Sequence, residues 1–189
     1  AALVIAIVAL VWSGAPRRPS TPGDSSAAAG FARDMAAHPE QAVAMAEIIR
    51  DRTEDAGLRL LATDIALTQQ SQIGRMRGWL DVWGLPTTGT EPRMTWMGEP
   101  ATGPMPGMAT AADVERLRTE PVADAENLFL RLMIEHHRAG VAMADAVLGA
   151  DVPAAVSVLA RGIVASQRSE IDVLRGILVD RGQSVPDAA

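Results

Sequence analysis

The sequence predicts an all-α fold, a four-helix bundle assembled from two similar helical hairpins. Of its 189 residues 48% are hydrophobic but only 3% are aromatic, and the β-branched residues are scattered rather than gathered into alternating runs. This composition favours helices over strands. Residues 31–84 and 129–182 also align without a gap, and 19 of the 54 aligned residues are identical. Two copies of an amphipathic hairpin can bury their hydrophobic faces against each other around a pseudo-twofold axis.

The chain starts with a hydrophobic, uncharged run, AALVIAIVALVW, over residues 1–12. We expect it to be the C-terminal part of a membrane-anchor helix, because twelve helical residues cover about 18 Å and a bilayer core is about 30 Å thick. The alternative is the hydrophobic region of a signal peptide. Residues 13–27 are rich in Ser, Pro and Gly and are expected to form a flexible tether. We expect the domain to lie on the extracytoplasmic side of the cell membrane.

Turn and capping sequences divide the remainder of the chain. The first helical hairpin is predicted over residues 28–84 and stops at the Gly-then-Pro ending GLP. The second is predicted over 123–183, with GADVP as its turn. Between them, residues 85–122 form a linker rich in Met, Pro and Gly, with a short helix that starts at the capping sequence TAAD. Residues 184–189 are a tail.

Each repeat places Met, His and Met on one face of its first helix, because spacings of three, seven and ten residues return to nearly the same side. These residues are Met35, His38 and Met45 in the first repeat, and Met133, His136 and Met143 in the second. Thioether sulfur and imidazole together suit Cu(I) better than zinc or iron, so copper is the metal that we expect here. The same pattern is also typical of a hydrophobic core, in which Met fills gaps and a buried His forms a hydrogen bond.

The two repeats differ beside their histidines. His137 lies about 100° around the helix from His136, so it is either a further ligand at the helix seam or a residue at the solvent edge. Pro39 occupies the equivalent position in the first repeat. Since Pro39 cannot donate to the Met35 carbonyl and disfavours helical geometry at His38, we expect a kink or a new helix start there. The second repeat, with its intact His pair, is therefore the stronger candidate site.

The linker contributes two more methionine pairs, Met94 with Met97 and Met105 with Met108. Such pairs either capture Cu(I) or pack as hydrophobic side chains onto the bundle or a partner protein. We favour packing.

Several classes of function are disfavoured by the sequence. The net charge of −6 and the dispersed Arg residues argue against nucleic-acid binding. The absence of cysteine excludes disulfides, thiolate zinc sites and Cys nucleophiles. A di-iron site in a helical bundle needs Glu-x-x-His pairs, and no Glu in this sequence has a His three residues later. We therefore do not expect an enzyme.

Four stretches together resemble the ferritin-like domain-of-unknown-function family 305 over roughly residues 28–183. They are FARDMAAHPEQAVAMAEIIRDRT, TDIALTQQSQIGRMRGWLDVWG, MPGMAT and LFLRLMIEHHRAGVAMADAVL. The resemblance implies a ferritin-like four-helix bundle, secreted or membrane-anchored, with members associated with copper binding or tolerance. By position, the family motif falls on Met35, His38, Met45, Met133, His136, His137 and Met143. Pro39 departs from it, because the family usually has a second His there.

The expected function is therefore that of a membrane-anchored protein that binds copper through Met and His for sequestration or delivery. The alternative is a structural or accessory subunit that docks on a membrane protein complex and binds no metal.

Overall fold

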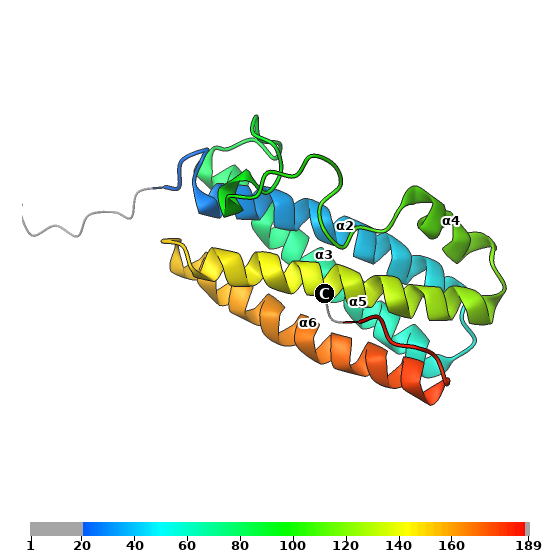
Figure 1. Ribbon diagram of the computed structural model, residues 1–189. Coiled ribbons are helices and arrows are strands. Elements are labelled where there is room, and N and C mark those ends of the chain that lie inside the picture. The colour runs from blue at the N-terminus through cyan, green and yellow to red at the C-terminus, as the bar shows by residue number, and fades with distance from the viewer. Residues whose placement is uncertain (1–20, 188–189) are drawn as a thin grey trace, which may run out of the picture.

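The computed structural model describes residues 21–187, in which four long helices form two hairpins (Figure 1). The first hairpin consists of α2 (Ala27–Arg52) and α3 (Ala56–Trp83), and the second of α5 (Val122–Leu148) and α6 (Ala154–Asp180). The segment between them contains the short 3-10 helix η1 (Thr95–Met97) and α4 (Ala111–Thr119). The predicted anchor, residues 1–12, lies outside the described residues. None of the helices within residues 21–187 combines the length and the hydrophobicity that crossing a bilayer requires.

The first hairpin is bounded by local capping interactions. The Ser26 hydroxyl accepts a hydrogen bond from the Ala29 N–H at the start of α2. The Asp55 carboxylate accepts the N–H groups of Gly57 at 2.8 Å and Leu58 at 3.1 Å, and so begins α3 immediately after the turn. α3 ends at Gly84, whose φ of 68° is a left-handed conformation that glycine adopts without strain.

The two hairpins meet mainly through their first helices, α2 and α5, which run antiparallel. Met35 near the start of α2 shares a hydrophobic cluster with Met143 in the second half of α5. Met45, two turns beyond His38, shares the other cluster with Met133, which precedes His136. This crossed pairing is the arrangement expected of two repeats related by a pseudo-twofold axis.

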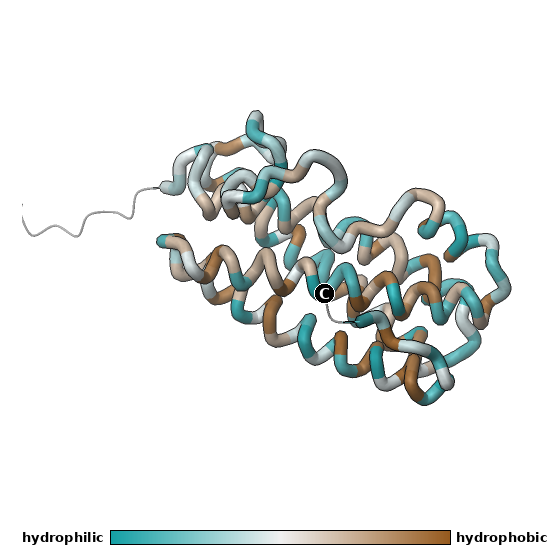
Figure 2. Tube along the Cα trace, in the orientation of Figure 1, coloured by the Kyte–Doolittle hydropathy of each residue, from teal (hydrophilic) through white to brown (hydrophobic). Residues whose placement is uncertain are grey.

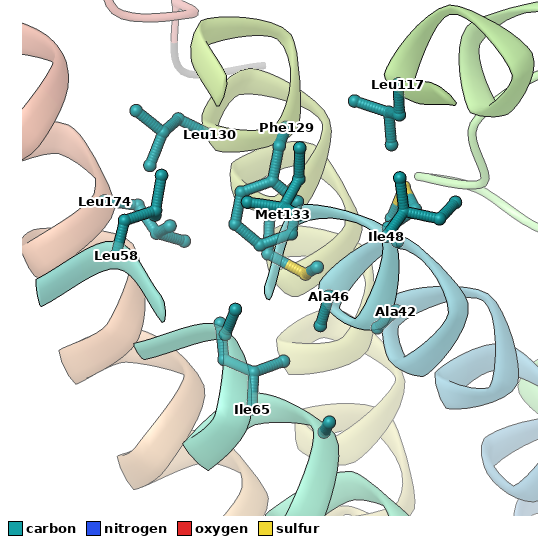
Figure 3. Packing of buried hydrophobic residues seen from close by; sticks show 14 of the residues in the cluster. Ala42, Ala46, Ile48, Leu58, Ile65, Leu117, Phe129, Leu130, Met133 and Leu174 are labelled. Carbon is teal, nitrogen blue, oxygen red and sulfur yellow. The ribbon is translucent and has the colours of Figure 1, made fainter. Parts of the chain in front are cut away.

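The hydrophobic core is divided into two clusters along the bundle. Hydrophobic and hydrophilic residues alternate along each long helix (Figure 2), and the buried hydrophobic side chains gather at both ends of the bundle. One cluster surrounds Phe129 and Met133, where Leu58 of α3 and Leu174 of α6 also approach each other (Figure 3). The other cluster surrounds Phe31, the residue equivalent to Phe129 in the first repeat. The duplication therefore places one fully buried phenylalanine in each half of the core.

Of the two outcomes predicted at Pro39, a kink or a new helix start, the new start is wrong. α2 is continuous from Ala27 to Arg52 with Pro39 inside it. A proline in a helix interior removes one hydrogen bond and costs about 3 kcal/mol. Here His38, Pro39 and Ala42 are buried and α2 packs against α3 and α5, and this packing keeps both halves of α2 in one helix.

Candidate metal centre

Three histidines meet in the interior of the bundle, between the two hydrophobic clusters. His38 of α2 and His136 of α5 have their ring centroids 3.8 Å apart, with the ring planes inclined by 30°. The ring centroids of His136 and His137 lie 6.2 Å apart. All three side chains have 0% exposure. The repeat thus brings the histidines of both copies together, and of the two interpretations of His137 the one at the solvent edge is wrong, because the residue is fully buried.

Each imidazole uses its Nε2 atom for a hydrogen bond to an oxygen. The Nε2 of His38 lies 3.2 Å from the Pro106 carbonyl, and that of His136 lies 3.1 Å from the His38 carbonyl. The Nε2 of His137 lies 2.5 Å from Oε2 of Glu170 on α6. Because carbonyl and carboxylate oxygens can only accept, Nε2 carries the proton in each neutral ring. This tautomer leaves Nδ1 with a free lone pair.

The three Nδ1 atoms are buried and have no hydrogen-bond partner within the described part of the protein. Burial lowers the pKa of His38 to about 4, although the hydrogen bond to Pro106 opposes the shift. Burial also lowers the pKa of His136 far below its usual value, and the neighbouring His38 and His137 add to this effect. His38 and His136 are therefore neutral at pH 7. A neutral imidazole with Nε2–H held by an oxygen and Nδ1 free is in the form that binds metals.

Buried methionines precede and follow the histidines along both α2 and α5. Met35 and Met143 lie in one hydrophobic cluster, and Met45 and Met133 lie in the other, all with at most 1% exposure. Within residues 21–187, no three His, Asp or Glu side chains converge closely enough to hold a metal ion by themselves. A metal at this centre therefore needs further donors beside the imidazoles, and the thioethers are a combination with imidazole that fits Cu(I).

The linker methionines are part of the same region. Met94 and Met105 are buried in the cluster that contains Met35 and Met143, and Met97 and Met108 pack against it. The preferred interpretation, packing onto the bundle, is confirmed. With Met76, seven of the nine methionines lie in or against this single cluster.

Glu170 is a functional candidate that the sequence alone did not indicate. Its carboxylate hydrogen-bonds to His137, one of the predicted ligands. In the aligned repeats Glu170 corresponds to Gln72, and His137 corresponds to Pro39. The first repeat thus lacks both members of the pair. The alignment of the repeats contains this joint replacement, but only the structure shows that the two positions are in contact.

Residues 94–109, which we call the strap, run along α2 (Figure 1), and their Pro106 carbonyl contacts the His38 ring. Asp34, His38 and Gln41 hold the strap, and their spacing of four and three residues places them on one face of α2. Oδ2 of Asp34 accepts the Met94 N–H at 2.8 Å and the Trp96 Nε1–H at 2.9 Å. Gln41 exchanges two hydrogen bonds with the backbone of Ala109, at 3.0 and 2.7 Å. One of the candidate ligands is therefore also an anchor of the strap.

Gly107 brings the strap into contact with α5. Its φ is 74°, and a Cβ at this position would lie 2.7 Å from both the Ala139 Cβ and the Glu135 carbonyl oxygen. It would also lie 3.1 Å from the His136 Cα. Only glycine fits so close an approach in this conformation.

Comparison with known proteins identifies the family of the chain. The family model described as "Domain of unknown function (DUF305)" matches residues 28–178. The chain belongs to the DUF305 family. No match was found among curated proteins.

Three solved structures show how far the likeness extends. A DUF305 protein from Streptomyces coelicolor, described as secreted, is 48% identical, covers 88% of this chain and is itself covered completely, with a TM-score of 0.83. A DUF305 fragment from Deinococcus radiodurans is 36% identical over 86% of this chain and 99% of its own, with a TM-score of 0.71. CopM in its Cu(I)-bound form is 25% identical over 79% of this chain and 94% of its own, with a TM-score of 0.60. The DUF305 fold of this chain is thus shared with a protein that binds copper.

Proposed function

We propose that this DUF305 protein is a membrane-anchored, extracytoplasmic protein with a ferritin-like bundle that binds Cu(I) for sequestration or delivery. One observation carries the proposal. The buried Nδ1 atoms of His38, His136 and His137 lack partners among the described residues, while their Nε2 atoms are held by oxygens. The thioethers of Met35, Met45, Met133 and Met143 lie in the clusters on either side. The Cu(I)-bound structure of CopM supports the choice of metal.

Imidazole and thioether are both neutral donors, so they hold a monovalent soft cation without a charged cage around it. His38 and His136 are poorly suited to acid–base catalysis at neutral pH, because burial keeps both rings in the neutral form. This donor set supports a role in binding copper rather than in a reaction.

Competition for Cu(I) with a chromophoric chelator under reducing conditions tests the proposal. We expect Met133→Leu, Met143→Leu and His136→Leu each to weaken Cu(I) binding about tenfold or more, which corresponds to about 1.4 kcal/mol. Leucine nearly conserves the volume of methionine, so the first two variants remove the sulfur and keep the packing. Far-UV circular dichroism checks that each variant remains helical.

Wild-type protein that takes up no Cu(I), or variants that bind it as tightly as wild type, would contradict the proposal. If metal-free protein instead co-purified with a defined membrane complex after gentle solubilisation, the chain would be an accessory subunit.

Glu170 is expected to tune the centre through His137. Glu170→Gln keeps an oxygen acceptor for Nε2–H but removes the negative charge, and glutamine already occupies the equivalent position, Gln72. A carboxylate behind a ligating imidazole fixes its orientation and raises its basicity, so we expect Cu(I) affinity to fall about tenfold. Asp172→Asn, at an exposed position of the same helix, removes the same charge outside the centre and should have no effect. Equal losses in both variants would indicate a general electrostatic effect and rule out a role for the hydrogen bond.

A further inference from the structure

The three histidines of the centre have 0% exposure, so no ligand reaches them from water unless part of the protein moves. The long helices are poor candidates for this movement. They supply most of the buried residues of both hydrophobic clusters, so separating them would disrupt the core. The strap is a better candidate, because side chains of α2 hold it onto the bundle.

The first half of the strap, up to Ala101, is firmly attached. Its Trp96 ring meets the Phe31 ring in a T-shaped contact, with the centroids 5.8 Å apart. A Cβ on Gly30 would lie 2.5 Å from the Trp96 ring, so the indole lies directly on the backbone of α2. The Ala101 N–H also donates to the Arg93 carbonyl at 2.8 Å. We therefore expect this half to stay in place when the strap moves.

The last five residues of the strap, 105–109, which we call the flap, are held less firmly. In the part of the chain that the structure describes, no backbone-to-backbone hydrogen bond joins the flap to a long helix. Two hydrogen bonds between Gln41 and Ala109 and one between the His38 ring and Pro106 hold it to α2. Each such bond adds little net stability, because water replaces it when the flap opens.

The flap lies between two exposed stretches, residues 102–104 and 110–112. A Cβ on Gly103 would have no atom within 4 Å, so the backbone there can rotate without losing packing contacts. Met105 is the only buried residue of the flap. Opening therefore exposes one side chain of the core and breaks a few hydrogen bonds, and it leaves the helices in contact.

Pro106 links the buried histidines to the surface. It is exposed, yet its carbonyl oxygen lies 3.2 Å from Nε2 of the fully buried His38. A single residue of the flap thus lies between this ring and water. A Cβ on Gly107 would lie 3.1 Å from the His136 Cα, so the flap also contacts the second histidine of the stacked pair.

We propose that residues 105–109 open as a flap, with the first half of the strap fixed, and so admit a metal ion to His38 and His136. Release of Gln41 from Ala109 frees the flap, and withdrawal of the Pro106 carbonyl uncovers the His38 ring. The identity of the metal as copper rests on the proposed function, whereas the opening itself does not depend on it.

Chemical modification of histidine tests the opening without any metal. Diethyl pyrocarbonate acylates neutral imidazole, and tandem mass spectrometry of the digested full chain gives the rate at each of the three histidines. His38 is neutral at pH 7, because burial lowers its pKa to about 4, so access limits its rate. Gln41→Leu removes both hydrogen bonds to Ala109. Gln70→Leu, the same substitution at an exposed position of α3, is the matched control.

We expect His38 to react about tenfold faster in Gln41→Leu than in wild type, because two of the bonds that close the flap are lost. His137, which faces Glu170 of α6, should react at the wild-type rate. Gln70→Leu should match wild type at all three histidines.

A reversible cross-link should give the opposite result. The chain has no cysteine, so Gln41→Cys with Ala109→Cys provides a single thiol pair that a short bis-methanethiosulfonate reagent can bridge. Bridging should slow the reaction of His38 to about a tenth or less of the unbridged rate, and a reductant should restore it. Cu(I) uptake by the bridged protein should slow in the same way.

Equal His38 rates in wild type, Gln41→Leu and the bridged protein would overturn the proposal. Equal acceleration at all three histidines would do so too, because the route would then be global unfolding. A response at His137 alone would place the entrance beside Glu170. A flap that behaves as expected in protein that takes up no Cu(I) would contradict the proposed function alone. Cu(I) uptake that the bridge does not slow would overturn the role of the flap and leave the proposed function in place.

Discussion

Acidification from pH 7 to pH 4 is expected to destabilise the metal-free protein by about 3 kcal/mol through His38 alone. Its pKa is about 4 in the folded chain, because of burial, against 6.5 for an imidazole exposed to water. Between these values the unfolded chain binds a proton that the folded chain does not, and each pH unit of this window lowers the free energy of unfolding by about 1.4 kcal/mol. The contribution of His38 is complete above pH 6.5, declines as the pH falls to about 4 and changes no further below that. His136 acts in the same direction.

Urea denaturation at pH 7, 5.5 and 4 measures this effect. Carboxylates such as Asp55 and Asp113, whose pKa values are lowered by hydrogen bonds, also contribute to acid destabilisation. The informative quantity is therefore the difference between wild type and His38→Gln, which places a non-titrating polar group at the same buried position. We expect the variant to lose less stability between pH 6.5 and 4. Equal losses in both proteins would show that His38 is protonated in the folded state.

Replacing Gly107 with alanine is expected to lower the free energy of unfolding by about 2–4 kcal/mol. The new Cβ would lie 2.7 Å from the Glu135 carbonyl oxygen, which belongs to the backbone of α5 and has no freedom to turn away. The backbone at Gly107 also has a positive φ, which is unfavourable for alanine. Both effects push the strap away from His136, so faster hydrogen exchange should appear in residues 94–109.

Substitutions at two other glycines of the linker separate the cost of the positive φ from the cost of the steric clash with α5. Gly98 has a φ of 81° and no atom within 4 Å of the position that a Cβ would take, so Gly98→Ala should cost about 1 kcal/mol from the backbone alone. Gly103 has neither feature, and Gly103→Ala should be neutral. Thermal unfolding of the three variants should rank them in this order. If Gly107→Ala were no worse than Gly98→Ala, the close approach of the strap to α5 would be wrong.

The sequence predicts the helices well, because helical periodicity and turn residues are local signals. It also identifies His38 and His136 as candidate ligands, but it places them in two separate candidate sites, and only the structure shows that their rings meet in one centre. The sequence does not predict which oxygen atoms accept hydrogen bonds from the Nε2 atoms of the three histidines. Two of them, the carbonyls of Pro106 and His38, belong to the backbone and carry no residue-type signal. The course of the strap also depends on contacts between residues about 60 positions apart, such as Asp34 with Met94.

Pro39 shows why the rule that proline interrupts a helix wrongly predicted a new helix start. Proline reduces helix propensity at its own position, yet most residues of α2 are buried and the helix packs against α3 and α5. Tertiary packing supplies more free energy than one missing hydrogen bond removes, so the helix continues through the proline.

The charge beside the histidines is distributed unequally between the two hairpins. In the first repeat, Pro39 and Gln72 occupy the positions that His137 and Glu170 occupy in the second. The two hairpins consist of helices of similar length, but in the part of the chain that the structure describes, Glu170 is the one carboxylate hydrogen-bonded to a histidine of the centre. Its negative charge attracts a cation toward α6 and away from the pseudo-twofold axis. Although the fold consists of two similar hairpins, a metal ion would therefore lie off the pseudo-twofold axis, closer to the second hairpin, which contains Glu170.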